Sequence, residues 1–272
     1  MHILNLLPQG PLPYLDVDAI QRYIHRLVST TSHPDTFIVW EASDTYTAGR
    51  RTKPADIPDP TVAVIRMDRG GSVTYHGPGQ LVIYPIIKIN PPADAVKFVR
   101  ATESAMIRAL RTIGVETSAI AGRSGVWVKR RGDIDRKLCA IGIKFSRDTT
   151  MHGMAFNVFT DLAKFMRVIP CGLADAGVTS LAQIGEKENL PCARYTLPQA
   201  AALLLPALAE AYAQFIPPAR KDGALTPLRE EKYLARIEEE REKAAHLPKI
   251  GIPRLPSAQK TEQRQNTGEQ TS

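Results

Sequence analysis

Cys171 is the residue of this sequence best suited to nucleophilic chemistry. It stands between Pro170 and Gly172 in IPCGLADAGVTSL, and these flanking residues predict a sharp turn that presents the thiol. A free cysteine has a pKa of about 8.5, which a neighbouring cation can lower to roughly 7.5 or below. Lys137, at the start of the apolar run KLCAIGIKF, is a candidate for that cation, although the spacing does not show that the two side chains meet.

The other two cysteines fit a different role. A lone cysteine is more often a buried core residue than a nucleophile. Cys139 lies inside an apolar run, and Cys192 also fits a core position, so we expect both to be buried and inert. Three cysteines without a CxxC pair argue against a disulfide framework and against a structural zinc site.

The segment RGGSVTYHGPGQ, residues 69–80, is the most unusual stretch of the chain. Its four glycines allow a close approach between backbone and ligand, and Arg69 and His76 add charge and proton chemistry. It matches neither a Walker loop nor a dinucleotide fingerprint. The segment predicts a ligand-binding loop without naming the ligand, and an elaborate hairpin with a structural histidine is an equally good interpretation. A weaker signal is MHGMAFNV, residues 151–158, where His and Gly precede a strand-like run.

These motifs need secondary structure to position them. Residues 16–28 carry apolar side chains at helical spacing, with Asp16 or Asp18 as a possible cap. Asp94 and Thr196 can cap two further helices. Short runs rich in β-branched residues predict strands at 37–40, 61–67, 81–89, 125–128 and 140–145. The mixed order of elements favours an α+β (mixed α/β) fold over a strict βαβ repeat.

Composition places the chain among ordinary globular proteins. It has 272 residues, of which 43% are hydrophobic and 23% charged. No window approaches the roughly 18 consecutive apolar residues of a membrane span, and no signal peptide is recognisable, so we expect a cytoplasmic protein without a membrane partner. The formal charge of +7 suits an acidic partner.

The composition changes near Pro217. We expect one domain at 1–216 and a charged tail at 217–272, helical over REEKYLARIEEEREKAA and then disordered. The tail contains 11 basic and 9 acidic residues, against 24 and 19 in the preceding part. The basic excess therefore belongs mostly to the first domain.

Together the motifs resemble the bacterial lipoyl and octanoyl transferase family, within the superfamily that also contains lipoate and biotin protein ligases. The resemblance runs from the helix near Asp16 to about Ile184 and includes, in the family's order, RGGSVTYHGPGQLVIYP, KLCAIGIKF, MHGMAFNVFTDLAKF and IPCGLADAGVTSL. The sequence departs from the family after Glu41, where Ala and Ser replace the usual His and Pro, and in the long segment KRRGDIDRK before Lys137. The resemblance implies a biotin/lipoate-ligase-like domain, in which helices flank a mixed β-sheet.

The resemblance also implies roles for individual residues. Cys171 would be the nucleophile and Lys137 the essential lysine. Three stretches would bind the acyl substrate: Arg69, Gly70, Gly71, Ser72, Val73, Thr74, Tyr75 and His76; Ala140, Ile141 and Gly142; Gly153, Met154 and Ala155. An apolar slot for the chain could involve Val73, Ile83, Ile141, Ile143 and Phe156, although a core position is the favoured interpretation for each.

The implied activity is octanoyl or lipoyl transfer in lipoate biosynthesis through a cysteine thioester. The implied donor is octanoyl-acyl carrier protein, and the implied acceptors are lipoyl domains of 2-oxoacid dehydrogenase complexes and the glycine cleavage H protein. A thioester is already activated, and the six scattered histidines show no metal-ligand spacing, so we expect no cofactor and no metal. Acidic carrier and lipoyl proteins would account for the basic charge without nucleic acid.

Other functions stay open at this point. An ATP-dependent lipoate or biotin protein ligase would share the fold, but it would not need a nucleophilic cysteine. An acyltransferase with another donor or acceptor would use the same chemistry. A non-catalytic acyl-carrier-binding module would not require both Lys137 and Cys171. An RNA-binding domain is least favoured, because only 6% of the residues are aromatic.

Overall fold

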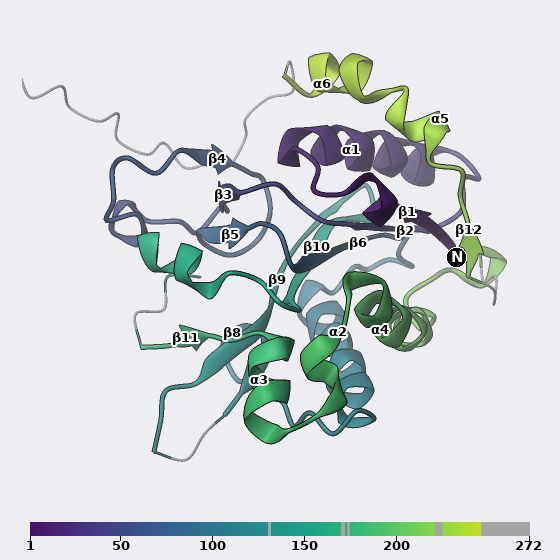
Figure 1. Cartoon of the computed structure of the whole chain (residues 1–272). Helices are drawn as coiled ribbons and strands as arrows, with labels where there is room; N and C mark the ends of the chain where they lie inside the picture. The colour runs from purple at the N-terminus through teal and green to yellow at the C-terminus, as the bar shows by residue number, and fades with distance from the viewer. Residues whose placement is uncertain (130–131, 170–171, 173–174, 221–224, 246–272) are drawn as a thin grey trace, which may run out of the picture.

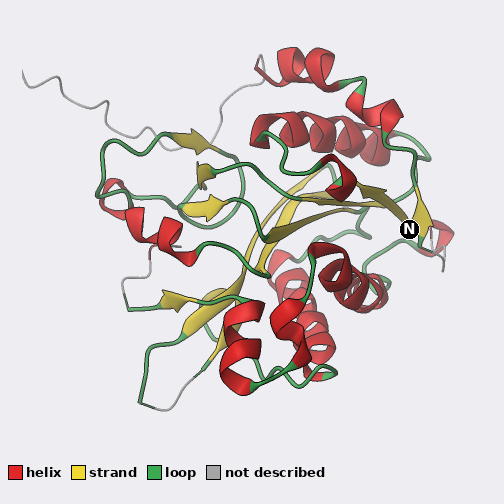
Figure 2. Cartoon of the chain, in the orientation of Figure 1, coloured by secondary structure: helices red, strands yellow, loops and turns green. Residues whose placement is uncertain are grey.

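The computed structural model describes residues 1–129, 132–169, 172, 175–220 and 225–245. Within them, helices cover both faces of a large mixed sheet, and a small three-stranded sheet lies to one side (Figures 1 and 2). The expected fold, a mixed sheet flanked by helices, is therefore confirmed. In the described part of the chain, no helix is both long and apolar enough to span a bilayer.

The large sheet contains nine strands in the described residues. They are β1 (His2–Asn5), β2 (Thr36–Trp40), β6 (Gln80–Ile86), β7 (Ser118–Ile120), β8 (Arg123–Val128), β9 (Arg136–Ser146), β10 (Thr149–Asn157), β11 (Gly177–Val178) and β12 (Thr226–Pro227). Their order is β12-β1-β2-β6-β10-β9-β8-β7, with β11 beside β9. β12, β1 and β2 are parallel, as are β11 and β9, and the remaining pairs are antiparallel.

The small sheet consists of β3 (Thr45–Ala48), β4 (Val64–Arg66) and β5 (Thr74–His76), in the order β4-β3-β5. β5 lies inside the glycine-rich segment that the sequence placed between two strands. Three residues between glycines are too few for alternation to be recognised. The five strands expected from the sequence all overlap observed strands, namely β2, β4, β6, β8 and β9.

The helices form two layers (Figure 1). They are α1 (Tyr14–Thr30), α2 (Ala95–Arg111), α3 (Leu181–Glu188), α4 (Leu197–Tyr212), α5 (Glu231–Leu234) and α6 (Ile237–Ala245). α1 and α6 lie on one face of the sheet and α2 and α4 on the other. Short helical turns occupy Leu7–Gln9, Pro54–Asp56, Leu162–Arg167, Pro191–Arg194 and Pro218–Arg220.

The expected caps are correct for two helices and wrong for the first. The Asp94 side chain accepts a hydrogen bond from the Lys97 amide at 2.9 Å, and Thr196 forms a capping box with the third residue of α4. α1 begins at Tyr14, earlier than expected, so Asp16 and Asp18 lie inside the helix and neither caps it.

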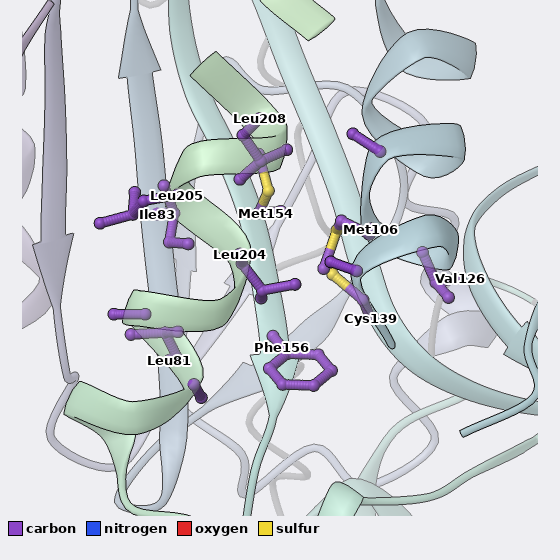
Figure 3. Packing of buried hydrophobic residues seen from close by; sticks show 14 of the residues in the cluster. Leu81, Ile83, Met106, Val126, Cys139, Met154, Phe156, Leu204, Leu205 and Leu208 are labelled. Atoms are coloured by element: carbon purple, nitrogen blue, oxygen red, sulfur yellow. The ribbon is translucent and has the colours of Figure 1, made fainter. Parts of the chain in front are cut away.

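The main core lies between the sheet and the α2–α4 layer. Cys139 is fully buried there, among Met106, Phe156 and the leucines of α4 (Figure 3). Cys192 is also buried, and burial raises the pKa of its thiol. Both cysteines are therefore buried, as the sequence predicted, and their lack of reactivity stays a prediction.

The first part of the expected tail packs against the rest of the protein. β12 adds an edge strand to β1, and α6 lies along α1. Tyr233 is buried against Tyr23, and the buried Glu240 carboxylate pairs with Arg26 at 2.8 Å. Residues 246–272 lie outside the described residues, so the expected disorder there, like the boundary after residue 216, stays a prediction.

Candidate active site

A cavity of about 270 Å³ lies on the face of the sheet opposite the main core. Its floor consists of small residues in register, because Ala140 pairs with Ala155 and Gly142 with Gly153 across β9 and β10. Side chains alternate between the faces of a strand, so the residues between these positions face the main core. The small floor leaves room for an apolar chain above the sheet.

The roof of the cavity is the segment that begins at Arg69. The buried Arg69 guanidinium donates hydrogen bonds to the Thr47 carbonyl at 2.8 Å and to the Gly70 carbonyl at 2.9 Å. A Cβ on Gly142 would lie 2.8 Å from the Gly70 carbonyl oxygen, and one on Gly49 would lie 2.4 Å from that of Gly71. Glycine is therefore required where roof and sheet approach each other.

Asp68 fixes the start of this roof to three other elements. Its carboxylate accepts hydrogen bonds from Arg22 of α1 at 3.0 Å, from Lys144 of β9 at 2.6 Å and from the His152 Nε2 of β10 at 2.8 Å. Burial alone would raise the pKa of Asp68, but the hydrogen bond from His152 and the pairing with Arg22 outweigh it and hold the pKa well below its usual range. The Gln21 side-chain amide donates to His152 Nδ1 at 3.1 Å, which leaves Nε2 as the donor to Asp68.

His76 is held in one tautomer by a chain of amides. The Asn157 amide donates to the Thr179 carbonyl at 3.0 Å, and the Gln80 amide donates to Asn157 Oδ1 at 2.9 Å. Gln80 Oε1 therefore accepts from His76 Nδ1 at 2.8 Å. Burial, reinforced by Arg69, lowers the pKa of His76 to about 3, so the ring is neutral and its Nε2 has no partner within the described residues.

Lys137 lies in β9 at one end of the cavity. An isolated lysine at the start of a strand is usually solvated, but Lys137 is only 7% exposed. Its Nζ lies 4.6 Å from the centroid of Trp127, directly across the β8–β9 pair. A Cβ on Gly125 would lie 2.5 Å from the Cys139 carbonyl oxygen, so glycine is required where β8 approaches β9 beside the Lys137 stem. No ion pair to Lys137 occurs among the residues that the structure describes.

Cys171 lies outside the described residues, but the next residue, Gly172, borders the same cavity as Lys137. Gly172 has a φ of +67°, and its amide donates to the Ile169 carbonyl at 3.0 Å. The Ile169 amide in turn donates to the Asp56 carbonyl at 2.8 Å. The chain on both sides of Cys171 is thus tied to the wall of the cavity.

Asp56 joins this turn to the roof. Its side chain accepts hydrogen bonds from the Ser72 hydroxyl and, at 2.9 Å, from the Lys53 amide. A Cβ on Gly172 would lie 3.3 Å from the Asp56 carboxylate. Asp56 therefore contacts the acyl-binding segment through its carboxylate and the segment before Cys171 through its backbone carbonyl.

A comparison with protein families identifies the family of this chain. A model of the lipoyl protein ligase A/B catalytic domain matches residues 13–195, a range that contains every residue described above. The chain belongs to this family.

Three relatives that match this chain share one activity in their names. Octanoyltransferases of Acidothermus cellulolyticus and Thermobifida fusca are 49% and 45% identical to this chain over 172 and 184 residues. These alignments cover 63% and 66% of this chain and 78% of each relative. An octanoyltransferase of Mycobacterium leprae is 50% identical over 157 residues, 56% of this chain and 67% of the relative.

Solved structures of lipoate ligases share the fold. The bipartite lipoate protein ligase of Thermoplasma acidophilum superposes with a TM-score of 0.63 at 14% identity, covering 89% of this chain and 91% of its own. Lipoate-protein ligase A bound with ATP gives a TM-score of 0.59 at 14% identity, and the superposition covers 89% of this chain and 94% of the ligase.

The three acyl-binding stretches expected in this lipoyl ligase A/B family member come together around the cavity. All of their residues border it except Val73 and Tyr75, which pack beside Phe165, where the Tyr75 hydroxyl donates to Asp44. Of the five apolar residues considered for the slot, Ile141 borders the cavity, and the other four pack in hydrophobic clusters: Val73, Ile83, Ile143 and Phe156. Whether these residues bind substrate stays a prediction.

Sequence reasoning missed several residues that shape the site. Asp56, Asp68 and Trp127 were not singled out. Glu41 was noted only as the residue before a departure from the family, although its side chain accepts from the Gly79 amide at 2.7 Å. The partners of Asp68 come from residues 22, 144 and 152, a spacing without a local pattern. In the described part of the chain, no group of three or more His, Cys, Asp or Glu side chains could hold a metal ion.

Proposed function

We propose that this protein is an octanoyltransferase of lipoate biosynthesis, which moves an octanoyl or lipoyl group from an acyl carrier protein to a lysine of a lipoyl domain. The observation that carries the proposal is that Lys137, Gly172 beside Cys171, and the three acyl-binding stretches border one cavity. The names of the relatives support the same reaction.

In the first half-reaction, the Cys171 thiolate attacks the thioester carbonyl of the donor. A carbon–sulfur bond forms to Cys171, the bond to the carrier thiol breaks, and that thiol leaves with a proton from the Lys137 ammonium. The chain would lie over the floor of Ala140, Gly142, Gly153 and Ala155. The ammonium of Lys137 would also favour the thiolate form of the cysteine.

In the second half-reaction, the amine of the acceptor lysine attacks the acyl-enzyme. Lys137, now neutral, accepts a proton from the incoming amine, an amide bond forms, and Cys171 is released as the thiolate. Backbone amides near the roof or the turn would stabilise the oxyanion. The Gly172 amide already donates to Ile169, so other amides would take this role.

The partners follow from this reaction. The donor would be octanoyl-acyl carrier protein, and the acceptors would be lipoyl domains of 2-oxoacid dehydrogenase complexes and the glycine cleavage H protein. Opposite charges would increase the encounter rate of these acidic proteins with the basic first domain and make it salt-dependent. The reaction needs no cofactor and no nucleic acid, and it would take place in the cytoplasm.

The test is the intact mass of the protein after brief incubation with octanoyl-acyl carrier protein and no ATP. We expect an added octanoyl group on the wild-type protein, loss of that group when an apo lipoyl domain is added, and no adduct on Cys171→Ser. Lys137→Ala should slow both steps. Turnover that requires ATP and proceeds without an adduct would instead support the lipoate ligase function, to which the fold neighbours also point.

A further inference from the structure

Two unpaired cations lie at the opening of the cavity. Arg51 and Lys53 border it and are exposed, whereas Arg69 and Lys137 are buried deeper, at 7% exposure each. Neither Arg51 nor Lys53 forms an ion pair with a carboxylate of the described residues. Two cations without a neutralising carboxylate at one opening create a positive potential there, and such a potential attracts an anionic ligand.

The backbone that carries these cations is fixed to the site. The Arg51 amide donates to the Gly71 carbonyl at 3.0 Å, and the Thr52 amide donates to the Gly49 carbonyl at 3.1 Å. The Lys53 amide donates to the Asp56 carboxylate at 2.9 Å. The two side chains therefore start from positions that are rigidly related to the roof and to the turn next to Cys171.

The charge balance of the cavity favours an anion. Among the described residues that border it, five are cationic (Arg51, Lys53, Arg69, Arg123 and Lys137) and Asp56 is the one carboxylate. Asp56 is buried and already accepts two hydrogen bonds. Arg123 pairs with the exposed Asp175, so Arg51 and Lys53 are the cations most available to a ligand that enters from solvent.

We propose that Arg51 and Lys53 form a subsite for the phosphodiester of the phosphopantetheine arm that carries the acyl group. The proposal rests on the proposed function, because a carrier-protein thioester is borne on such an arm and the arm must enter through this opening. An arginine fork and a lysine ammonium are the side chains that proteins use for phosphate. The phosphodiester lies at a fixed number of bonds from the thioester, so holding it positions the reacting carbonyl.

The experiment compares two small donors, octanoyl-pantetheine and octanoyl-phosphopantetheine, which differ only in the phosphate. The second-order rate constant for octanoyl-enzyme formation is measured by intact mass on the full-length protein. We expect wild type to react about tenfold faster with the phosphorylated donor, a preference that falls with added salt. In the double variant Arg51→Ala/Lys53→Ala, the ratio of the rate constants for the two donors should fall to near one. The main cause should be a slower reaction with the phosphorylated donor.

Arg108→Ala/Lys187→Ala is the matched control, because it removes one exposed arginine and one exposed lysine that do not border the cavity. It should keep the wild-type preference, and thermal unfolding should confirm that both double variants are folded. Equal rates with both donors in wild type, or a preference that survives Arg51→Ala/Lys53→Ala, would overturn the subsite. The absence of any adduct with either donor would contradict the proposed function instead.

Discussion

At the scale of single residues, the best-defined proton position is that of His76. The Thr179 carbonyl can only accept, so it orients Asn157, and Asn157 Oδ1 in turn orients Gln80. Gln80 Oε1 therefore faces the ring, and the neutral ring carries its proton on Nδ1. The ring can stay neutral with its proton held on Nδ1, so no catalytic proton transfer has to be assigned to His76. The ring lies 5.2 Å from that of Tyr14 and borders the cavity as a neutral surface.

The lowered pKa of His76 predicts a pH-dependent stability. The unfolded chain binds a proton at this histidine below pH 6.5, whereas the folded protein does so only near pH 3. The contribution of the neutral ring to the free energy of unfolding is therefore fully present above pH 6.5. It is lost as the pH falls towards 3, by at most about 1.4 kcal/mol per pH unit. Denaturant unfolding over this range measures the free energy of unfolding of wild type and of His76→Phe. The difference between the two free energies should shrink with that slope as the pH falls. A constant difference would mean that His76 protonates equally in both states.

Trp127 is the residue whose removal should affect Lys137 most directly. The ring faces the ammonium, an arrangement that stabilises a cation by roughly 0.5–2 kcal/mol. Trp127→Leu should slow octanoyl-enzyme formation about fivefold or more, whereas Trp127→Phe, which keeps an aromatic face, should lose less. Single-turnover rates with one donor provide the measurement. If the two variants are slowed equally, packing rather than the aromatic face positions the lysine.

At the scale of elements, the site depends on how one loop is attached to a helix and two strands. Asp68 connects the roof to α1, β9 and β10, and Asp56 connects it to the turn next to Cys171. Both are buried or nearly buried carboxylates surrounded by donors. Removing such a charge leaves partly buried cations with less compensation, although Arg22 keeps its ion pair with Asp18.

Asp68→Asn should accordingly destabilise the protein by about 3 kcal/mol, because it leaves Arg22 and Lys144 facing a neutral amide. Asp59→Asn is the control, since that carboxylate is solvent-accessible and its loss should change stability little. Denaturant midpoints of both variants provide the comparison. An Asp68→Asn protein as stable as the control would show that the roof does not need this anchor.

The sequence predicted the elements that have strong local signals. The capped helices α2 and α4 and the apolar strands β2, β6 and β9 were placed correctly from the residues alone. The short strands β1, β3, β5 and β12 were missed, because two to four residues are too few to show alternation and their pairing is non-local. For the same reason the sequence could not show that Lys137 faces Trp127 or that it shares a cavity with Gly172.

At the scale of the whole molecule, one cavity is enclosed by segments that are far apart in the sequence. The glycine-rich segment supplies its roof, β9 and β10 supply its floor, and the turn at Gly172 borders it. The resemblance supplied the candidate residues, and the sheet register explains why they converge, since small residues pair across β9 and β10. The anchoring carboxylates have no sequence signature, because their partners are assembled only by folding.

The C-terminal segment offers the last prediction. Composition favoured a solvated tail after residue 216, yet β12 and α6 cover β1 and α1, and Tyr233 and Glu240 are buried. Truncation after Ile216 should therefore lower the thermal midpoint by several degrees and expose the α1 face. Truncation after Ala245 is the control, because it keeps both contacts, and it should leave the midpoint and octanoyl transfer near wild type. If both truncations behave like wild type, α6 covers α1 without stabilising it, and the segment after 216 is free to serve as a docking element.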